Sequence, residues 1–392
     1  MNNSLNLFII AGEASGDKLG GALMQGLNTL YDGQIQYRGV GGDQMIANGL
    51  PSLFDMSDLS VMGLVEILPK IPKLLSRVKT TARAAIAQKP DAIITIDSPD
   101  FCFRVVAKIK ETYPDIPVIH YVAPSVWAWR PERAQKMAQY VDHVLALLPF
   151  EPPYMTDAGM TCDFVGHPAA FEPPLDAAEL GAMKQQLGLD GPVITLLPGS
   201  RAGEIKRMMP IFHQVANNIF AKHSDANFLL PVARPVAKQV QRAVAKWALP
   251  VKLLLPQPDA QATEMRKNAA YAISDVALAT SGTVALELAA QNCPMVVAYR
   301  ANWATTRMVK KLAQIDTANL INIVTQSRVI PEFLFENCTP DHITPALLAL
   351  LNDKTALSAQ ESALKNTMKA LGRDDHDMKL AAARSVLNKL GK

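Results

Sequence analysis

Three side chains that suit group transfer stand just after short apolar runs of this sequence. Asp97 can take a proton from an attacking hydroxyl, a kind of assistance that contributes roughly 10²–10⁴-fold to a rate. Arg201 can bind a phosphate through its guanidinium group. Glu287 can accept hydrogen bonds from both hydroxyls of a ribose. We therefore expect a nucleotide to be bound by its phosphates at one end and by its ribose at the other.

The residues expected to bind the nucleotide lie in two junctions. In each, an apolar strand is followed by a turn of small residues and then by a helix. The first is 193–204 and the second is 276–289. In open α/β sheets, such junctions bind anionic groups because the free N–H groups of the helix point at the crevice. The alternatives are that Arg201 bridges the cleft structurally and that Glu287 is an exposed helix residue, although the neighbours of Glu287 are apolar. The predicted nucleotide-binding residues are Ser200, Arg201, Gly282, Thr283 and Glu287.

A turn rich in small residues, 11–21, follows the first apolar run and opens a helix. Small residues let the backbone approach a ligand, and Glu13, Ser15 and Asp17 are candidates to contact it. The glycine spacing is neither that of a dinucleotide fold nor that of a P-loop. The alternative is a tight turn whose glycines serve packing alone.

Asp97 ends an apolar run, and Asp100 follows three residues later. A carboxylate at the carboxyl end of a strand lies where catalytic groups of open sheets belong. The alternative is that Asp97, Ser98 or Asp100 caps the helix that starts near Phe101. We favour catalysis for Asp97 and capping for Asp100.

Segment 120–130 is the densest polar and aromatic stretch of the chain. His120, Ser125 and Trp127 are candidates to line the acceptor site, since spaced tryptophans can build an amphipathic wall for a sugar or a lipid. The alternatives are that the tryptophans belong to the core and that His120 is an interior histidine rather than a base.

Segment 65–79 combines an apolar stripe with flanking basic residues at helical spacing. A basic amphipathic helix can lie in an anionic membrane surface. An ordinary domain helix with a solvated basic edge gives the same pattern. The candidate membrane or acyl-chain residues are Ile67, Lys70, Ile71, Lys73, Leu74, Leu75 and Arg77.

Alternating short strands and helices position these residues, a pattern typical of parallel α/β layers. The 392 residues are too many for one ordinary core. We therefore predict two doubly wound, Rossmann-like parallel-sheet domains that face an interdomain cleft. We expect an N-terminal acceptor and catalytic domain over 1–170, a nucleotide-binding domain over 171–350, and a helical tail over 351–392 that packs back on the first domain.

Composition excludes several other classes. The net charge of +3 is mild, and no basic stripe with interleaved aromatics points to nucleic acid. The cysteines are too far apart in sequence to form a CxxC pair or a disulfide framework, which fits a reducing cytoplasm. No motif predicts a metal site, no GxSxG elbow predicts a hydrolase, and no run is long enough to span a membrane. We expect no metal and no cofactor.

At these motifs the chain resembles the lipid-A-disaccharide synthases, bacterial glycosyltransferases of the GT-B architecture. The resembling segments follow in order along nearly the whole chain, and only their combination is specific. They are AGEASGD from Ala11, VMGLVEIL from Val61, IDSPDF from Ile96, HYVAPSVWAWR from His120, LLPFE from Leu147, LLPGSR from Leu196, SGTVALE from Ser281 and CPMVVAYR from Cys293.

The resemblance implies transfer of 2,3-diacylglucosamine from UDP-2,3-diacylglucosamine to 2,3-diacylglucosamine 1-phosphate. The product is a β-1,6-linked disaccharide phosphate of lipid A, in the lipopolysaccharide pathway of Gram-negative bacteria. The family is metal-independent, inverts the anomeric carbon, and works as a peripheral protein at the inner face of the cytoplasmic membrane. A homodimer is left open.

The resemblance also assigns roles to particular residues. It makes Asp97 the expected base for the acceptor 6-hydroxyl. It also makes Glu13, which matches a functionally important glutamate of the family, the second expected catalytic residue. It places Asn319 near the active site. Two other readings remain at this point: a soluble UDP-sugar enzyme of the same architecture, such as an epimerase or a cell-wall transferase, and a non-catalytic nucleotide sensor at the membrane. UDP release with and without acceptor separates the three.

Overall fold

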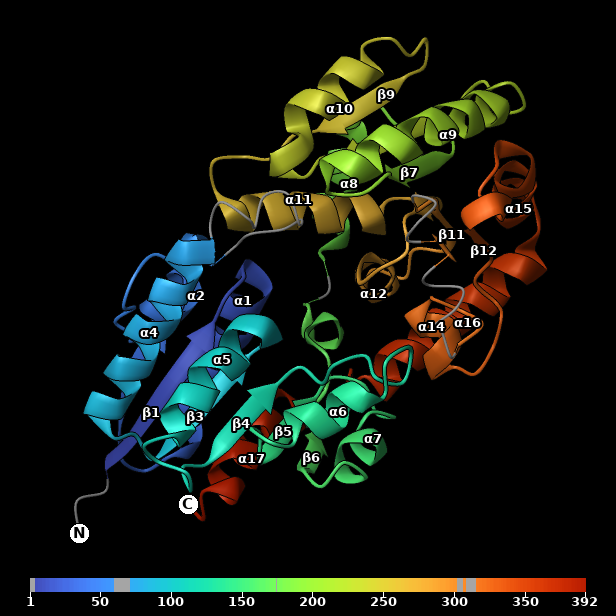
Figure 1. The fold of residues 1–392 in the computed structure, drawn as a ribbon. Helices are drawn as coiled ribbons and strands as arrows, with labels where there is room; N and C mark the ends of the chain where they lie inside the picture. Colours follow the sequence, from blue (N-terminus) through green and yellow to red (C-terminus); the bar gives the residue numbers. More distant parts are fainter. Residues whose placement is uncertain (1–3, 60–70, 174, 302–305, 308–314) are drawn as a thin grey trace. The chain divides into compact units, whose positions relative to one another are not determined.

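The computed structural model describes residues 4–59, 71–173, 175–301, 306–307 and 315–392. The chain divides into two compact units (Figure 1). Unit 1 contains residues 1–168 and 371–392, and unit 2 contains residues 169–370. Each unit is built on its own parallel sheet.

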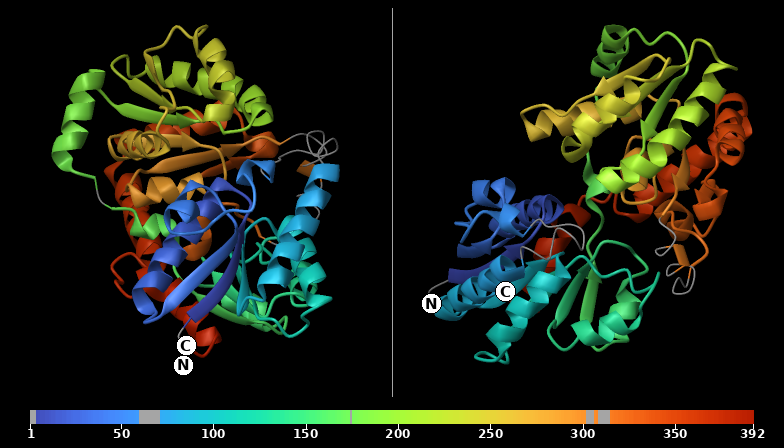
Figure 2. Two further views of the ribbon diagram at one scale, coloured as in Figure 1. Left: turned by 90° about the vertical axis from the view of Figure 1, so that its left-hand side faces the viewer. Right: turned by 45° about the horizontal axis from the view of Figure 1, so that its top comes forward.

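The sheet of unit 1 has six parallel strands in the order β2-β1-β3-β4-β5-β6. An all-parallel sheet needs helices on both faces, and Figures 1 and 2 show helices on each side of it. The strands are β1 (Ser4–Ala11), β2 (Gln34–Val40), β3 (Ala92–Ile96), β4 (Val118–Tyr121), β5 (His143–Ala146) and β6 (Thr161–Phe164).

Strand β1 shows how the two faces are filled. Leu5, Leu7 and Ile9 pack with helix α1, whereas Phe8 and Ile10 belong to the cluster formed with helices α4 and α5. The alternation follows from the two-residue period of a strand. The helices of this unit are α1 (Ala14–Leu30), α2 (Asp43–Ala47), α4 (Ile71–Gln88), α5 (Pro99–Lys110), α6 (Glu132–Met137), α7 (Pro152–Thr156) and the 3-10 turn η1 (Met56–Asp58).

The end of the chain belongs to unit 1, whereas residues 351–370 belong to unit 2. Helix α17 (Ala381–Lys389), preceded by the 3-10 turn η6 (Met378–Leu380), packs on α1 and β5. A β-carbon on Gly26 would lie 2.9 Å from that of Ala383, so the two helices approach closely. The hydroxyl of Ser385 lies 2.7 Å from Nε2 of the buried His143 and donates to Asp163 at 2.6 Å.

The sheet of unit 2 also has six parallel strands, in the order β12-β11-β10-β7-β8-β9. Strand β12 was not predicted, because its three residues carry too short a pattern to stand out. The strands are β7 (Val193–Leu197), β8 (Asn227–Pro231), β9 (Val251–Leu254), β10 (Val276–Ala279), β11 (Met295–Tyr299) and β12 (Glu332–Leu334).

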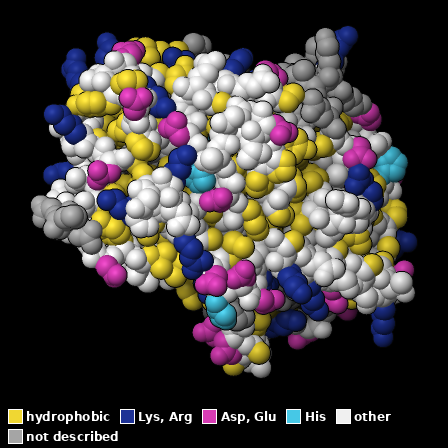
Figure 3. Space-filling view, turned by 90° about the horizontal axis from the view of Figure 1, so that it is seen from below, with side chains coloured by type: hydrophobic (Ala, Val, Ile, Leu, Met, Phe, Trp, Pro, Cys, Tyr) yellow, Lys and Arg dark blue, Asp and Glu magenta, His cyan; other side chains and the backbone are white. Residues whose placement is uncertain are grey.

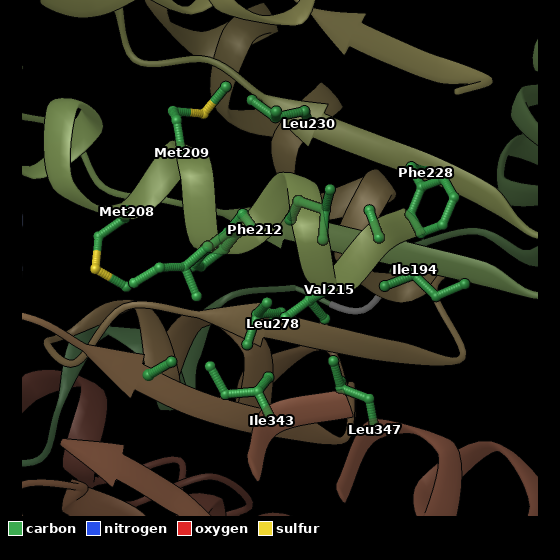
Figure 4. Close-up of a cluster of buried hydrophobic side chains, with 14 of the residues drawn as sticks. Ile194, Met208, Met209, Phe212, Val215, Phe228, Leu230, Leu278, Ile343 and Leu347 are labelled. Carbon is green, nitrogen blue, oxygen red and sulfur yellow. The ribbon is translucent and has the colours of Figure 1, made fainter. Parts of the chain in front are cut away.

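One core cluster of unit 2 lies between this sheet and helices α9 and α15, and a second packs the sheet against α8 and α11. Figure 4 shows Phe212 and Val215 of α9 packed with Ile194 and Leu278 of the sheet and Ile343 of α15. The helices are α8 (Ala177–Leu187), α9 (Ala202–Phe220), α10 (Ala237–Val244), α11 (Ala260–Ala272), α12 (Val284–Ala290), α14 (Leu320–Val324), α15 (Pro340–Asn352), α16 (Lys354–Ala370) and the 3-10 turns η3 (Pro168–Phe171), η4 (Arg234–Val236) and η5 (Phe335–Asn337).

The predicted fold class is confirmed: both units are doubly wound α/β structures with parallel sheets. On the face drawn in Figure 3, basic side chains lie among acidic ones rather than in one continuous basic field. Among the helices that the structure describes, none is long and apolar enough to cross a membrane.

Candidate functional site

Each sheet has a point where the direction of winding reverses, and such points bind ligands in open α/β sheets. In unit 1 the chain runs from β1 to β2 on one side and then places β3 on the other side of β1. Glu13 follows β1 and Asp97 follows β3. The topology therefore brings both carboxylate-bearing segments, which are far apart in sequence, to one switch point.

The loops after β1 and β3 touch. Ala11 and Ile96 are paired in register at the ends of the two strands. A β-carbon on Gly12 would lie 2.5 Å from Oγ of Ser98, so only glycine lets the loops approach this closely. Glu13, which is partly buried, occupies the N-cap position of α1, and Ser15 is exposed in the first turn.

Asp97 and Ser98 both have left-handed backbone conformations, with φ of 51° and 45°. Two successive non-glycine residues at positive φ are strained, and such strain concentrates at functional sites. The Asp97 N–H donates to the carbonyl of Tyr121 at 3.0 Å, which fixes this turn against β4. The side chain of Ser98, the N-cap residue of α5, makes no capping hydrogen bond, and Asp100, which was expected to cap this helix, lies inside its first turn.

Asp17 has a structural role that differs from the expected ligand contact. Its buried carboxylate accepts hydrogen bonds from the backbone N–H groups of Gly42, Gln44 and Met45 at 2.8, 2.9 and 3.1 Å. These donors open helix α2, whose first N–H groups have no partner within the helix. Asp17 therefore fixes α2 against α1 rather than contacting a ligand.

His120 is an interior residue, which corrects its assignment to the acceptor site. It is 2% exposed, and its Nδ1 lies 2.7 Å from the hydroxyl of Thr95 on the neighbouring strand. Burial lowers the pKa of His120 to about 4, so the imidazole is neutral. The alternative of a hydrogen-bonded core histidine is the one that the structure supports.

Ser125 and Trp127 lie in the loop after β4, which is anchored by a glutamate that the sequence interpretation missed. Ser125 is exposed, whereas Trp127 is buried and donates its indole N–H to Oε1 of Glu151 at 3.3 Å. The other oxygen of Glu151 accepts from the N–H groups of Leu147 and Leu148. Burial raises the pKa of Glu151 to about 7. The LLPFE segment contained this residue, but nothing in the sequence predicted its burial.

Unit 2 has its switch point between β7 and β10, where both nucleotide-type junctions end. Gly199 has φ of 115°, and a β-carbon there would meet the Glu204 carboxylate at 2.6 Å. Oε2 of Glu204 accepts from the N–H groups of Ser200 and Arg201 at 3.1 and 3.3 Å. Glu204 thus already binds the two amides that were expected to meet a phosphate.

The guanidinium of Arg201 is oriented by the same carboxylate. Its Nη1 lies 3.0 Å from Oε1 of Glu204, and 63% of the Arg201 side chain is exposed. The guanidinium has five N–H donors, so most remain available to an anion. The Arg201 guanidinium is therefore the charged group of this junction that remains available to a phosphate, whereas the Ser200 amide is already bonded to Glu204.

Glu287 lies on α12, just after the turn that contains Gly282 and Thr283. Gly282 has φ of 150° and both turn residues are exposed. The Glu287 side chain is 38% exposed, and its carboxylate lies 3.1 Å from the ammonium of Lys267 on α11. Lys267 was not singled out in the sequence, where nothing links it to a position 20 residues later.

Asn319 is buried and begins helix α14. Its Oδ1 accepts from the N–H of Ile321 at 2.8 Å, which is an N-cap interaction. The neighbouring Asn322 is fully buried and bonds to Thr317, Ile330 and Glu332. Asn319 is thus part of a polar network within residues 317–332.

The candidate membrane helix is described from Ile71 onward, and Ile67 and Lys70 lie outside the described residues. Ile71 and Leu75 are exposed at 39% and 45%, whereas Leu74 is partly buried. Lys73 and Arg77 both bond to Asp58, and these bonds lower the pKa of that carboxyl. The basic flank is therefore partly neutralised, and the exposed apolar side chains are the more prominent feature.

Solved structures of nucleotide-sugar enzymes share this fold. S. aureus MnaA in complex with UDP is similar with a TM-score of 0.68 and 13% identity, over 99% of this chain and 97% of that chain. UDP-GlcNAc 2-epimerase from Neisseria meningitidis bound to UDP-GlcNAc gives 0.63 and 13%, over 99% of each chain. Acinetobacter baumannii MurG gives 0.53 and 14%, also over 99% of each. The chain has the GT-B fold of glycosyltransferases and related epimerases.

Sequence relatives give the family. The model of the family described as lipid-A-disaccharide synthetase matches residues 7–386. A lipid-A-disaccharide synthase from Ruegeria pomeroyi is 50% identical over 388 residues, which cover 98% of this chain and 96% of that protein. One from Rhodospirillum centenum is 42% identical over 390 residues, covering 99% and 95%. The chain belongs to the lipid-A-disaccharide synthase family.

Proposed function

We propose that this protein condenses UDP-2,3-diacylglucosamine with 2,3-diacylglucosamine 1-phosphate into the β-1,6-linked lipid A disaccharide 1-phosphate and releases UDP. Membership of the family supports the reaction. The observation that carries the assignment of residues is the placement of Asp97 and Glu13 at one switch point, and of Arg201 and Glu287 at the other.

Unit 2 binds the UDP moiety in this proposal. The exposed guanidinium of Arg201 contacts the diphosphate, together with Ser200 and the turn of Gly282 and Thr283. Glu287 accepts the two ribose hydroxyls. A fixed cation at the diphosphate stabilises the charge that develops as UDP leaves, without a metal ion.

Unit 1 binds the acceptor and supplies the base. Asp97 accepts the proton of the acceptor 6-hydroxyl while the oxygen attacks the anomeric carbon from the face opposite UDP, which inverts that carbon. Glu13 lies in the adjoining loop and contacts the acceptor, and Ser15 and Ser125 are further acceptor candidates of this unit. Asn319, a buried residue of unit 2, is a candidate that rests on the family resemblance alone. The strained turn at Asp97 supports a catalytic role, because strain of this kind concentrates at functional sites. Its hydrogen bond to β4 fixes the position of the turn.

The acylated substrates also call for an apolar surface. We propose that the protein acts as a peripheral protein at the inner face of the cytoplasmic membrane, and that Ile71 and Leu75 at the start of α4 contact the acyl chains or the bilayer. A homodimer remains a further proposal, which a sedimentation experiment tests directly.

UDP release from UDP-2,3-diacylglucosamine, measured with and without 2,3-diacylglucosamine 1-phosphate, tests the proposed function. We expect release only when the acceptor is present, together with formation of a disaccharide phosphate. Release without acceptor would indicate hydrolysis or epimerase-type chemistry, and binding without turnover would indicate a nucleotide sensor. Either result would contradict the proposal.

A further inference from the structure

Helix α11 presents a cation and a phenol to the Glu287 carboxylate. The Lys267 ammonium lies 3.1 Å from Oε2 of Glu287 and 2.6 Å from Oε2 of Glu264. Burial raises the pKa of the Tyr271 phenol, and the nearby charge of Glu287 raises it further. Lys267 and Tyr271 are one helical turn apart, so they lie on the same face of α11. Figure 1 shows α11 and α12 in the same unit, and the two helices are in contact.

These partners are more buried than Glu287 itself. Tyr271 is 1% exposed and the Lys267 side chain 21%, whereas the Glu287 side chain is 38% exposed. Burial lowers the pKa of Lys267, but the carboxylates of Glu287 and Glu264 raise it by more, so the ammonium keeps its charge. The ion pair with Lys267 thus holds Glu287 from helix α11, while part of the Glu287 side chain is exposed.

We propose that Lys267 is a positioning residue for ribose recognition, which acts by fixing the Glu287 carboxylate through their ion pair. This inference rests on the proposed ribose role of Glu287. A glutamate has several rotatable bonds, and a carboxylate that is already oriented loses less freedom when two hydroxyls bind to it. Lys267 therefore sets how strongly the site prefers a nucleotide that has both ribose hydroxyls.

A different role for Lys267 would be direct contact with the diphosphate. The two roles differ in what they require of the ligand. A contact with phosphate acts equally on UDP and on 2′-deoxy-UDP, since the diphosphates are the same. A positioning effect on Glu287 acts mainly on UDP, because 2′-deoxy-UDP lacks one of the two hydroxyls that the carboxylate accepts.

The experiment measures the dissociation constants of UDP and 2′-deoxy-UDP by calorimetry for the full chain and five variants. We expect the parent to bind UDP about tenfold more tightly than 2′-deoxy-UDP, which corresponds to about 1.4 kcal/mol. Lys267→Met should weaken UDP binding about tenfold and 2′-deoxy-UDP binding far less. Lys267→Arg should restore most of the preference. Arg266→Met, which removes a neighbouring charge, should change neither constant.

Equal weakening of both ligands, or no change with Lys267→Met, would overturn the inference. Lys267→Gln provides the same comparison with a polar side chain should the Met variant fold poorly. Glu287→Gln separates this inference from the proposed function on which it rests. If Glu287→Gln leaves UDP binding unaltered, the ribose role itself is wrong; if it weakens binding while Lys267→Met does not, only the role of Lys267 is wrong.

Discussion

Gly12 lies against the side chain of Ser98 so closely that a β-carbon at Gly12 would fall 2.5 Å from the Ser98 hydroxyl oxygen and 2.9 Å from its β-carbon. Ser98 cannot easily move away from such a β-carbon, since its backbone is in a left-handed conformation and Ser98 is the N-cap residue of helix α5. The loop of Glu13 and the loop of Asp97 therefore fix each other's position.

We expect Gly12→Ala to lower turnover by tenfold or more and to leave UDP affinity unchanged, because it displaces the loops of unit 1 only. Turnover and the dissociation constant of UDP are the two measurements. Gly181→Ala is the matched control, since a β-carbon there meets nothing within 4 Å and Gly181 lies inside helix α8. Equal turnover in both variants would show that the contact between the loops is dispensable.

Arg201→Ala should weaken UDP binding by about tenfold or more, because an arginine–phosphate contact of this kind is strong and directional. Uridine, which has no phosphate, should bind the variant and the parent equally. Arg242→Ala on helix α10 removes an exposed arginine elsewhere in unit 2 and serves as control. Weaker binding of uridine by the Arg201 variant would argue against a contact with the diphosphate.

Glu151 should make the stability of the protein depend on pH. Burial raises its pKa from 4.5 to about 7, so the folded protein binds this proton more tightly than the unfolded chain. Protonated Glu151 therefore contributes to the free energy of unfolding at low pH. This contribution is lost as the pH rises from about 4.5 to about 7. A pKa shift of this size changes the free energy of unfolding by about 3 kcal/mol at most.

Denaturant unfolding of the parent and of Glu151→Gln at pH 5 and pH 8 measures this effect. The difference in unfolding free energy between the two pH values should be smaller in the variant, which has no titrating group at this position. The same difference in both proteins would mean that Glu151 does not titrate in this range.

Replacing Ile71 and Leu75 by serine should reduce partitioning to anionic vesicles about tenfold, because it removes exposed apolar surface from the start of α4. Met265→Ser removes an exposed apolar side chain from unit 2 and should have no effect. Asp58→Asn should increase partitioning, since it releases Lys73 and Arg77 from their shared carboxylate. Unchanged partitioning of the serine variant would contradict the proposed surface.

Much of the fold was predictable, because its strands are short apolar runs that end in turns of small residues. Asp97, Glu13, Arg201 and Glu287 were predicted for a related reason: ligands of open α/β sheets bind at the carboxyl ends of strands, and those ends are visible in a sequence. Their roles stay predictions. Strand β12 was missed because its three residues have no strand pattern of their own. It is a strand because it pairs with β11.

The remaining differences come from three-dimensional partners that no local pattern encodes. Asp17 stands in a glycine-rich turn like a ligand-binding residue, yet its partners are amides of a helix about 25 residues later. His120 ends an apolar strand, but its neighbour Thr95 binds it inside the sheet. Glu151 and Lys267 gain their roles from burial and from side chains on other elements.

The most direct test of the account is the turnover and UDP affinity of Asp97→Asn with both acylated substrates. Asparagine tolerates the left-handed backbone at position 97, so the turn should persist while the proton acceptor is lost. We predict a decrease in turnover of roughly 10²–10⁴-fold, with an unchanged dissociation constant for UDP. Turnover equal to that of the parent would remove Asp97 from the mechanism and contradict the proposed site.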